Sequence, residues 1–238
     1  MKYVNMRIIS ISFIASLVLI LMSCSEPKIY KGGKEWKFSM KSSDQIVADT
    51  IYLKSFDEIT DRFDIKSHWV RFKLLENGGS NISVGESGIE DGTWLSLTPR
   101  KINIPPYRSS DDYSTLTGML PYPGVEYPIS IGQKTNWELT PRACWEELEG
   151  KTVKGYIEVI DKIYYSNDIV QDSCWVLSAI GKSEVGEFSA KYYFSEKYGF
   201  IYFNYDFSDY TVEINLIGYN DNADSISILP ELYYAQPE

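Results

Sequence analysis

The sequence predicts a mainly β fold, with an antiparallel sheet curled into a half-barrel or a sandwich and one or two short helices. Three observations lead to this prediction. Apolar and polar residues alternate with period two in many runs, short polar turns join the runs after Gly150, and the chain contains 19 tyrosines. No helical pattern separates the later runs, so neighbouring strands are expected to pair antiparallel. Tyrosine suits such a sheet because its ring can be buried while its hydroxyl stays in water.

Residues 1–23 have the pattern of a secretory signal peptide, which is removed from the mature protein. Lys2 and Arg7 precede an apolar stretch that is too short to span a membrane comfortably. The stretch ends in Leu21-Met22-Ser23-Cys24, which resembles the lipobox of bacterial lipoproteins. That resemblance implies a diacylglyceryl group on the Cys24 sulfur and a further acyl chain, such as palmitate, on its amino group. The alternatives are an ordinary secreted thiol or an uncleaved anchor helix.

The mature chain would be strongly acidic. Removing residues 1–23 leaves 21 basic and 33 acidic side chains, a formal net charge of 21 − 33 = −12. An acidic surface repels phosphate backbones and anionic headgroups, so no nucleic-acid partner is expected and lipidated Cys24 would provide the membrane contact. We expect residues 24–34 to form a flexible tether and residues 35–238 a single β-rich domain.

The first strands are predicted at 36–40 and 46–53, where apolar and β-prone residues recur. Residues 55–58 then have the spacing of a helix capping box, and Phe56, Ile59 and Phe63 would share one helical face, so the pattern predicts a short helix over 56–64. Further strands are predicted at 69–75, 94–98, 153–165, 174–180, 187–194, 199–207 and 210–219. Turns are expected at 77–79, 91–92, 181–183, 197–199 and 220–222.

Residues 99–141 form a proline-rich segment that holds seven of the ten prolines. Such a segment can be a lid or binding element, or a strap that closes off sheet edges. Tyr107 and Tyr122 lie on its stiff backbone, while Tyr193 and Tyr202 belong to strands that are aromatic on both faces. These four tyrosines are the candidate ligand surface. The alternative is ordinary burial of the two-faced strands under loops.

Two cysteines remain once Cys24 is assigned to lipid. A disulfide between Cys144 and Cys174 would close a loop of about thirty residues and stabilise the fold by roughly 3–4 kcal/mol. The alternative is two buried thiols that pack as small apolar groups. A metal site is not expected, because the chain has no CxxC spacing and only one histidine, His68.

Enzymatic chemistry finds little support in the sequence. His68 would have to serve any Ser-His-Asp triad, yet no GxSxG turn supplies a nucleophile. Carboxylate pairs such as Glu146-Glu147 are expected on solvated faces of so acidic a chain. The acidic residues at 220–224 fit a hairpin turn better than a calcium loop. We therefore lean against an enzyme and expect no cofactor.

Several segments carry a resemblance to known proteins. Ile-Pro-Pro-Tyr at 104–107, Leu-Pro-Tyr-Pro-Gly-Val-Glu-Tyr-Pro at 120–128 and Tyr-Phe-Ser-Glu-Lys-Tyr-Gly-Phe-Ile at 193–201 resemble a family of uncharacterised lipoproteins from Bacteroides-type bacteria. Members of that family tend to have Pro-Pro-Arg where this chain has Pro105-Pro106-Tyr107. The resemblance covers roughly residues 100–207, and it implies a lipid-anchored, β-rich envelope protein without an established activity.

Two functional hypotheses follow. The first is a non-enzymatic binding module in which an aromatic-lined sheet, partly covered by the proline-rich segment, holds an apolar or carbohydrate ligand; it predicts a deep apolar groove beside 105–128. The second is a structural or assembly protein that contacts other envelope proteins through a sheet edge or an aromatic patch. Both place the protein on the extracytoplasmic side of a bacterial membrane, the outer membrane being the expected one.

Overall fold

The computed structural model describes residues 29–30, 33–43, 49–59, 64–74, 80–84, 93–98, 101–104, 120–139, 151–184, 186–209 and 211–221. All regular elements in these ranges are β-strands, and all strand pairs are antiparallel. This confirms the predicted mainly β, antiparallel fold. The described part of the chain contains no helix that is long and apolar enough to cross a membrane.

The described part of the chain contains strands β1 to β13. They are β1 (Glu35–Ser42), β2 (Asp49–Ile59), β3 (Asp64–Leu74), β4 (Ser80–Val84), β5 (Thr93–Thr98), β6 (Lys101–Asn103), β7 (Gly124–Glu126), β8 (Lys134–Leu139), β9 (Val153–Ser166), β10 (Gln171–Ser183), β11 (Gly186–Ser195), β12 (Gly199–Asp206) and β13 (Thr211–Asn220). The proline-rich segment thus contributes β6, β7 and β8, which the sequence analysis did not predict.

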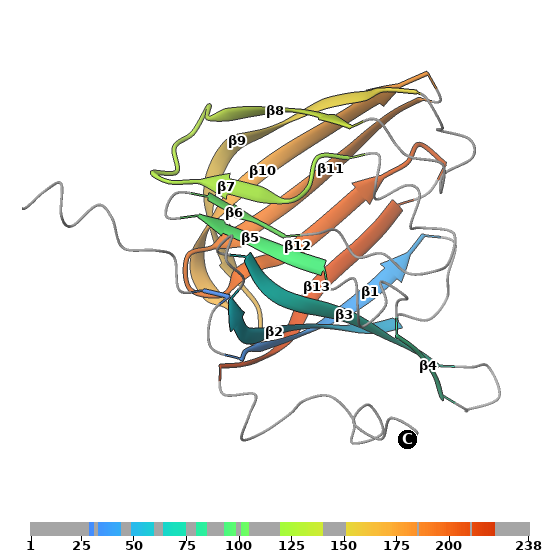
Figure 1. Ribbon diagram of the computed structural model, residues 1–238, viewed down its shortest axis with the longest axis vertical. Helices are drawn as coiled ribbons and strands as arrows, with labels where there is room; N and C mark the ends of the chain where they lie inside the picture. Colours follow the sequence, from blue (N-terminus) through green and yellow to red (C-terminus); the bar gives the residue numbers. More distant parts are fainter. Residues whose placement is uncertain are drawn as a thin grey trace, which may run out of the picture.

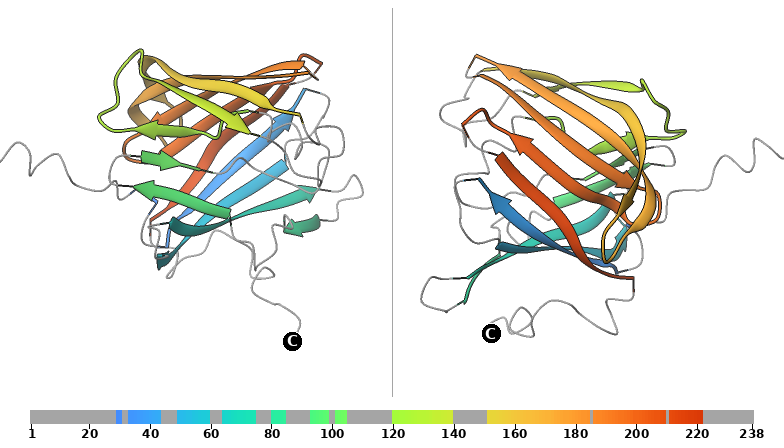
Figure 2. Two further views of the ribbon diagram at one scale, coloured as in Figure 1. Left: turned by 45° about the horizontal axis from the view of Figure 1, so that its top comes forward. Right: turned by 180° about the vertical axis from the view of Figure 1, so that it is seen from behind.

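The strands form one sheet that curls round until its two ends approach each other (Figures 1 and 2). The order is β7-β6-β5-β3-β2-β1-β13-β12-β11-β10-β9-β8, with β4 paired to β3 beside this path. The end strands β7 and β8 are consecutive in the chain and are joined by residues 127–133, but each pairs on one side only, with β6 and β9 respectively. The barrel is therefore open along one seam, between β7 and β8.

Two local predictions are wrong. The expected helix over 56–64 is not formed, because residues 56–59 complete β2 and Asp64 begins β3. Ile59 pairs with Ile65 across these strands, so pairing with β3 overrides the helix-like spacing. The expected turn at 181–183 lies inside β10, which continues to Ser183 opposite Gly186. The turn at 197–199 is confirmed between β11 and β12.

The wall formed by β1 and β9–β13 turns large apolar side chains into the barrel. Trp36 and Phe38 of β1 and Phe203 of β12 are fully buried there, and the Phe38 and Phe203 rings meet edge to face at 5.8 Å. The hydroxyl of Tyr192 on β11 donates a hydrogen bond of 3.3 Å to the carbonyl oxygen of Pro121, just before β7. This bond links the wall to the segment just before β7. The aromatic side chains of the wall fill the interior of the barrel between these two parts.

Residues before β1 belong to this core as well. Ile29 and Tyr30 are buried, and the Tyr30 ring lies 4.8 Å from that of Trp36, between ring centroids. The sequence analysis assigned both residues to the tether of 24–34. The packed part of the chain therefore includes the end of that segment.

Candidate functional site

The sequences of β7 and β8, the two strands that border the seam, explain their structure. Prolines limit the length of β7, and exposed and half-buried side chains alternate along β8. β7 has only three residues and lies between Pro123 and Pro128; proline has no N–H to donate to a ladder, which limits the strand. In β8 the side chains of Lys134, Asn136 and Glu138 are exposed, while those between them are half-buried. This alternation turns Trp137 toward the barrel and polar groups toward water.

The connection between the seam strands is fixed at both ends. The Gln133 side-chain amide donates to the Glu126 carbonyl at 3.0 Å. The N–H of Gly132 donates to the Val159 carbonyl at 2.7 Å, and the N–H of Val159 donates to the Gln133 carbonyl at 2.9 Å. These bonds tie residues 132–133 to β7 on one side and to β9 on the other, so they set the spacing of the seam.

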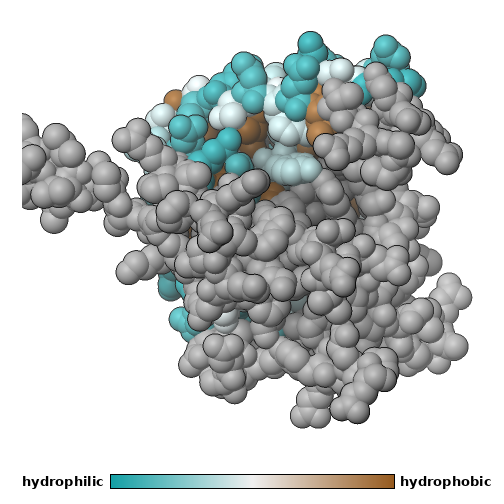
Figure 3. Space-filling model, in the orientation of Figure 1, coloured by the Kyte–Doolittle hydropathy of each residue, from teal (hydrophilic) through white to brown (hydrophobic). Residues whose placement is uncertain are grey.

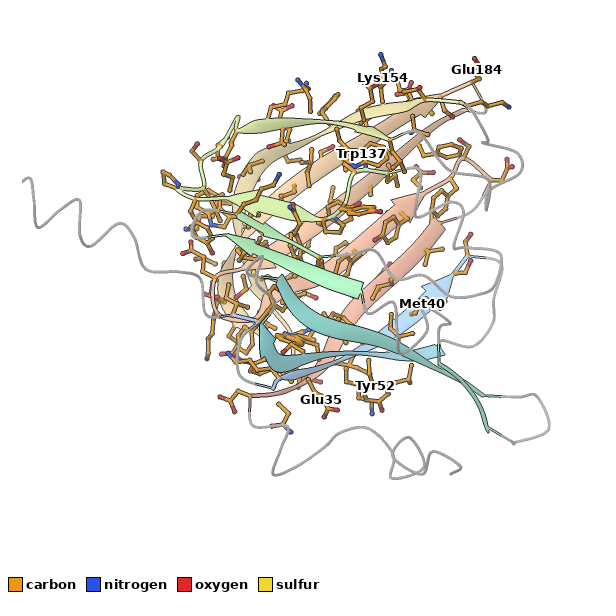
Figure 4. The ribbon with its side chains drawn as sticks, in the orientation of Figure 1. Glu35, Met40, Tyr52, Trp137, Lys154 and Glu184 are labelled. Atoms are coloured by element: carbon orange, nitrogen blue, oxygen red, sulfur yellow. The ribbon has the colours of Figure 1, made fainter. Side chains whose placement is uncertain are left out.

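A groove of about 120 Å³ lies in the seam, and we call it the seam groove. The rings of Tyr122 and Trp137 stand at one end of it, with centroids 6.4 Å apart and planes inclined by 47°. Figure 4 shows Trp137 on the side of β8 that faces β7. The groove is lined by Lys101, Asn103, Pro121, Tyr122, Gly124, Val125, Glu126, Thr135, Asn136, Trp137 and Ile157.

Polar groups surround the two rings. Asn103 and Asn136 present side-chain amides from opposite sides of the seam, and neither has a hydrogen-bond partner among the described residues. Gly124 makes room for Asn103, because a Cβ on this glycine would collide with the Asn103 Oδ1. The groove therefore combines aromatic faces with donors and acceptors that are open to a ligand.

The floor of the seam groove is apolar and closed. Val125 of β7 lies against Ile157, Val159 and Leu177, and the space left among them is only about 10 Å³. All four side chains are buried. The groove is thus a shallow surface site with a mixed lining. The predicted deep apolar groove is not found among the described residues, and residues 105–119 lie outside them.

The structure separates the predicted ligand-surface tyrosines. Tyr122 lies in the seam groove, whereas Tyr193 and Tyr202 stack on each other on the opposite face of the sheet, with centroids 4.6 Å apart and planes inclined by 26°. Tyr107 lies outside the described residues, as do Cys24 and Cys144.

The end of the β9–β10 hairpin covers the Tyr193–Tyr202 pair. The ring of Tyr165 meets that of Tyr193 edge to face at 5.7 Å. Beyond it, the side-chain amide of Asn167 donates to the Leu216 carbonyl on β13 at 3.1 Å. Burial raises the pKa of both Tyr165 and Tyr202 above the ordinary value. These tyrosines therefore hold the hairpin against the sheet, in agreement with the alternative of ordinary burial.

Cys174 is a buried free thiol in the structure. Burial, assisted by the nearby Asp172 carboxylate, raises its pKa to about 12. Its Sγ lies 3.7 Å from the Asp172 carbonyl oxygen, to which it donates a weak hydrogen bond. A Cys144–Cys174 disulfide stays a prediction, because Cys144 lies outside the described residues.

Trp137 is one of the groove residues that the sequence analysis did not select as a candidate ligand-binding residue. The sequence feature that could have identified Trp137 is a single large aromatic residue in the mostly polar run Lys-Thr-Asn-Trp-Glu-Leu. Such a run is typical of an edge strand with one large apolar side chain. In Figure 3, hydrophilic residues dominate the described surface at the top of the view, over β8 and β9, with hydrophobic residues visible between them. Among the described residues, no group of three or more His, Cys, Asp or Glu side chains is placed to hold a metal ion.

Comparison with known proteins identifies the fold. No family model and no curated protein matches the chain. Among solved structures, a candidate exported protein with a YmcC-like fold from Bacteroides fragilis matches with a TM-score of 0.50 at 7% identity, over 83% of this chain and 100% of that one. This chain has a similar fold.

Two further structures match less closely. They are a candidate lipoprotein from Parabacteroides distasonis (TM-score 0.47, 8% identity, 83% of this chain and 99% of that one) and a barrel-like protein of unknown function from Brucella abortus (TM-score 0.42, 6% identity, 81% of this chain and 98% of that one).

Proposed function

We propose that this chain is a lipid-anchored protein of the bacterial envelope that binds a carbohydrate in the seam groove without chemically changing it. The observation that carries the proposal is the pairing of Tyr122 and Trp137 beside the amides of Asn103 and Asn136. Sugars present apolar C–H faces, which pack on aromatic rings, and hydroxyls, which hydrogen-bond to amides. A concave site with aromatic walls and a few placed polar groups is typical of small-molecule recognition.

The composition of the groove favours a carbohydrate over a purely apolar ligand. An apolar ligand would cover the exposed Asn136 amide and the half-buried Asn103 amide without offering them hydrogen bonds, and each polar group desolvated in this way costs about 1–3 kcal/mol. The closed floor formed by Val125, Ile157 and Leu177 also leaves no deep chamber below the groove. A flat, polar ring that lies along the seam fits these constraints better.

The envelope location is supported by the start of the chain. The apolar stretch before Cys24 and the lipobox-like residues around it are the features of an exported lipoprotein. The Bacteroides fragilis protein of similar fold is described as exported, which agrees with this location. Two or more acyl chains would hold the protein durably, whereas a single chain binds reversibly.

The assembly hypothesis has less support at the seam. Addition of a partner strand needs an open edge, and β8 places Lys134, Asn136 and Glu138 along its exposed side. Charged side chains on an edge strand discourage edge-to-edge pairing. The seam is therefore better suited to a small ligand than to a strand of another protein.

Binding can be tested with the full-length lipidated chain, purified in detergent and applied to an array of bacterial and plant oligosaccharides. We expect Tyr122→Ala to weaken binding of any captured glycan at least about tenfold, a loss of ~1.4 kcal/mol. Tyr164→Ala is the matched control, because Tyr164 is 69% exposed and lies outside the groove. Absence of any captured glycan, or equal losses in both variants, would refute the proposal.

The lipid anchor has a separate test. In cells fed a labelled fatty acid, the wild-type chain should take up label and sediment with membranes. Cys24→Ala should lose the label and leave the membrane fraction. Continued labelling of this variant would contradict lipidation at Cys24.

A further inference from the structure

We infer that the bound carbohydrate is a neutral oligosaccharide, which extends past Trp137 from the seam groove into a second depression that Trp137 also lines. This inference rests on the proposed function and names the ligand class of the same site. The second depression, here called the outer depression, has a volume of about 340 Å³ and is lined by Asn136, Trp137, Glu138, Lys154 and Gly155. It is more open than the seam groove.

Trp137 and Asn136 line both hollows, so the two are adjacent and share one wall. Trp137 is paired with Gly155 across the β8–β9 ladder. Gly155 also lines the outer depression. A Cβ at this position would collide with the carbonyl oxygen of Ile180, so the close packing of β9 on β10 requires glycine here. Trp137 is therefore in contact with both hollows.

The small volume of the seam groove indicates that the ligand extends beyond it. Sites for drug-sized molecules usually measure about 300–1,000 Å³. The seam groove alone, at about 120 Å³, falls well below this range, whereas the outer depression, at about 340 Å³, lies within it. A ligand that uses the aromatic end of the groove gains much more contact by continuing past Trp137. A chain of linked sugar rings has the required shape.

The charges around the outer depression favour a neutral chain. Lys154 Nζ lies 3.7 Å from Glu138 Oε2, and Figure 4 shows Lys154 at the outer surface of the sheet. On the same two strands Lys134 Nζ lies 3.8 Å from Glu158 Oε2. Each ammonium group is thus balanced by a carboxylate, so the surface offers hydrogen-bond donors and acceptors without a net charge. An anionic glycan would find no unpaired cation in this depression.

The test compares ligand lengths on the full-length chain in detergent. The probes are the homo-oligosaccharides of glucose, mannose and galactose with one, two and four units, and affinity is measured by titration calorimetry. In the series that binds, the affinity for four units should exceed that for one unit at least tenfold. The double variant Glu138→Ala/Lys154→Ala should lower this ratio several-fold, because it strips polar groups from the outer depression only.

A matched control is available on the same sheet. Lys182 and Glu187 form an exposed ion pair of 2.6 Å between β10 and β11. Lys182 pairs with Lys154 across the β9–β10 ladder, but neither Lys182 nor Glu187 lines a depression, so Lys182→Ala/Glu187→Ala should keep the wild-type ratio. Binding that does not depend on length, or equal ratios in both double variants, overturns the inference while leaving the proposed function in place. Failure to bind any of the three series overturns the inference, and failure on the broader oligosaccharide array overturns the proposed function too.

Discussion

The hydroxyl oxygen of Tyr30 accepts a hydrogen bond of 2.8 Å from the backbone N–H of Phe200. Tyr30 precedes β1, and Phe200 lies in β12 directly after a turn. Trp36 strengthens this contact, since its indole N–H donates to the Tyr198 carbonyl at 2.7 Å. The start of the folded chain is thus fastened to the β11–β12 turn by two buried aromatic side chains.

Tyr30→Phe should destabilise the protein although it removes a single atom. The Phe200 N–H would lose its partner in a fully buried position, which costs about 1–3 kcal/mol. Urea unfolding followed by tryptophan fluorescence measures the change in the free energy of unfolding. Tyr164→Phe, at an exposed tyrosine, is the control and should have almost no effect. Equal stability of the two variants would show that the Tyr30 hydrogen bond contributes nothing.

Gly199→Ala should cost more stability than Gly132→Ala. Both glycines have positive φ, +79° and +83°, so either alanine pays roughly 1–2 kcal/mol for the left-handed backbone. At Gly132 nothing lies within 4 Å of an added Cβ, whereas at Gly199 the Cβ would collide with the Tyr30 hydroxyl. The difference between the two free energies of unfolding therefore isolates the Tyr30 contact. If Gly132→Ala were the more harmful change, the packing of Tyr30 on the turn would be wrong.

Stability should fall at alkaline pH. Burial raises the pKa of Tyr127 and Tyr219 from 10.0 to about 12 and also raises that of Tyr192 well above 10.0. The unfolded chain therefore releases these protons at lower pH than the folded chain, which makes unfolding more favourable as pH rises. Their contribution is fully present below pH 10 and is lost as pH rises through about 12. Phenolate absorbance and circular dichroism should change together over this window; phenolate formation in a still folded protein would contradict the prediction.

Cys174 should resist alkylation in the folded protein. Its pKa of about 12 leaves almost no thiolate at neutral pH, and the thiolate is the reactive form. Iodoacetamide should label Cys174 only after unfolding in urea, as read by peptide mass spectrometry. Samples unfolded without reductant provide a second readout. Labelling without reductant indicates a free thiol, and labelling that needs reductant supports the predicted bond to Cys144.

The strands after Gly150 could be predicted because their signal is local. Strands β9 to β13 are long, alternate with period two and are joined by short turns, so the sequence pattern and the pairing agree. The helix predicted over 56–64 failed because the spacing of Phe56 and Ile59 also fits a strand, and β3 provides a pairing partner. The choice between the two depends on contacts from outside the segment, which local pattern does not contain.

The candidate site was predicted only in part for the same reason. Tyr122 was selected for its proline-rich surroundings, and it does line the groove. Trp137 was not selected, because its place in the groove depends on β6 and β7 at the far end of the sheet. Tyr193 and Tyr202 were selected as strand aromatics, but their sequence does not reveal that the hairpin end around Tyr165 covers them.

The first and last strands of the sheet in chain order, β1 and β13, lie side by side in its middle (blue and red in Figure 1). Met40 pairs with Ile214, so this ladder cannot form until the chain has been synthesised past residue 214. Contacts so distant in sequence also form slowly. The strands on either side of the ladder join into one wall only through it. A nascent chain that lacks β13 would therefore have two separate groups of strands in place of one continuous wall.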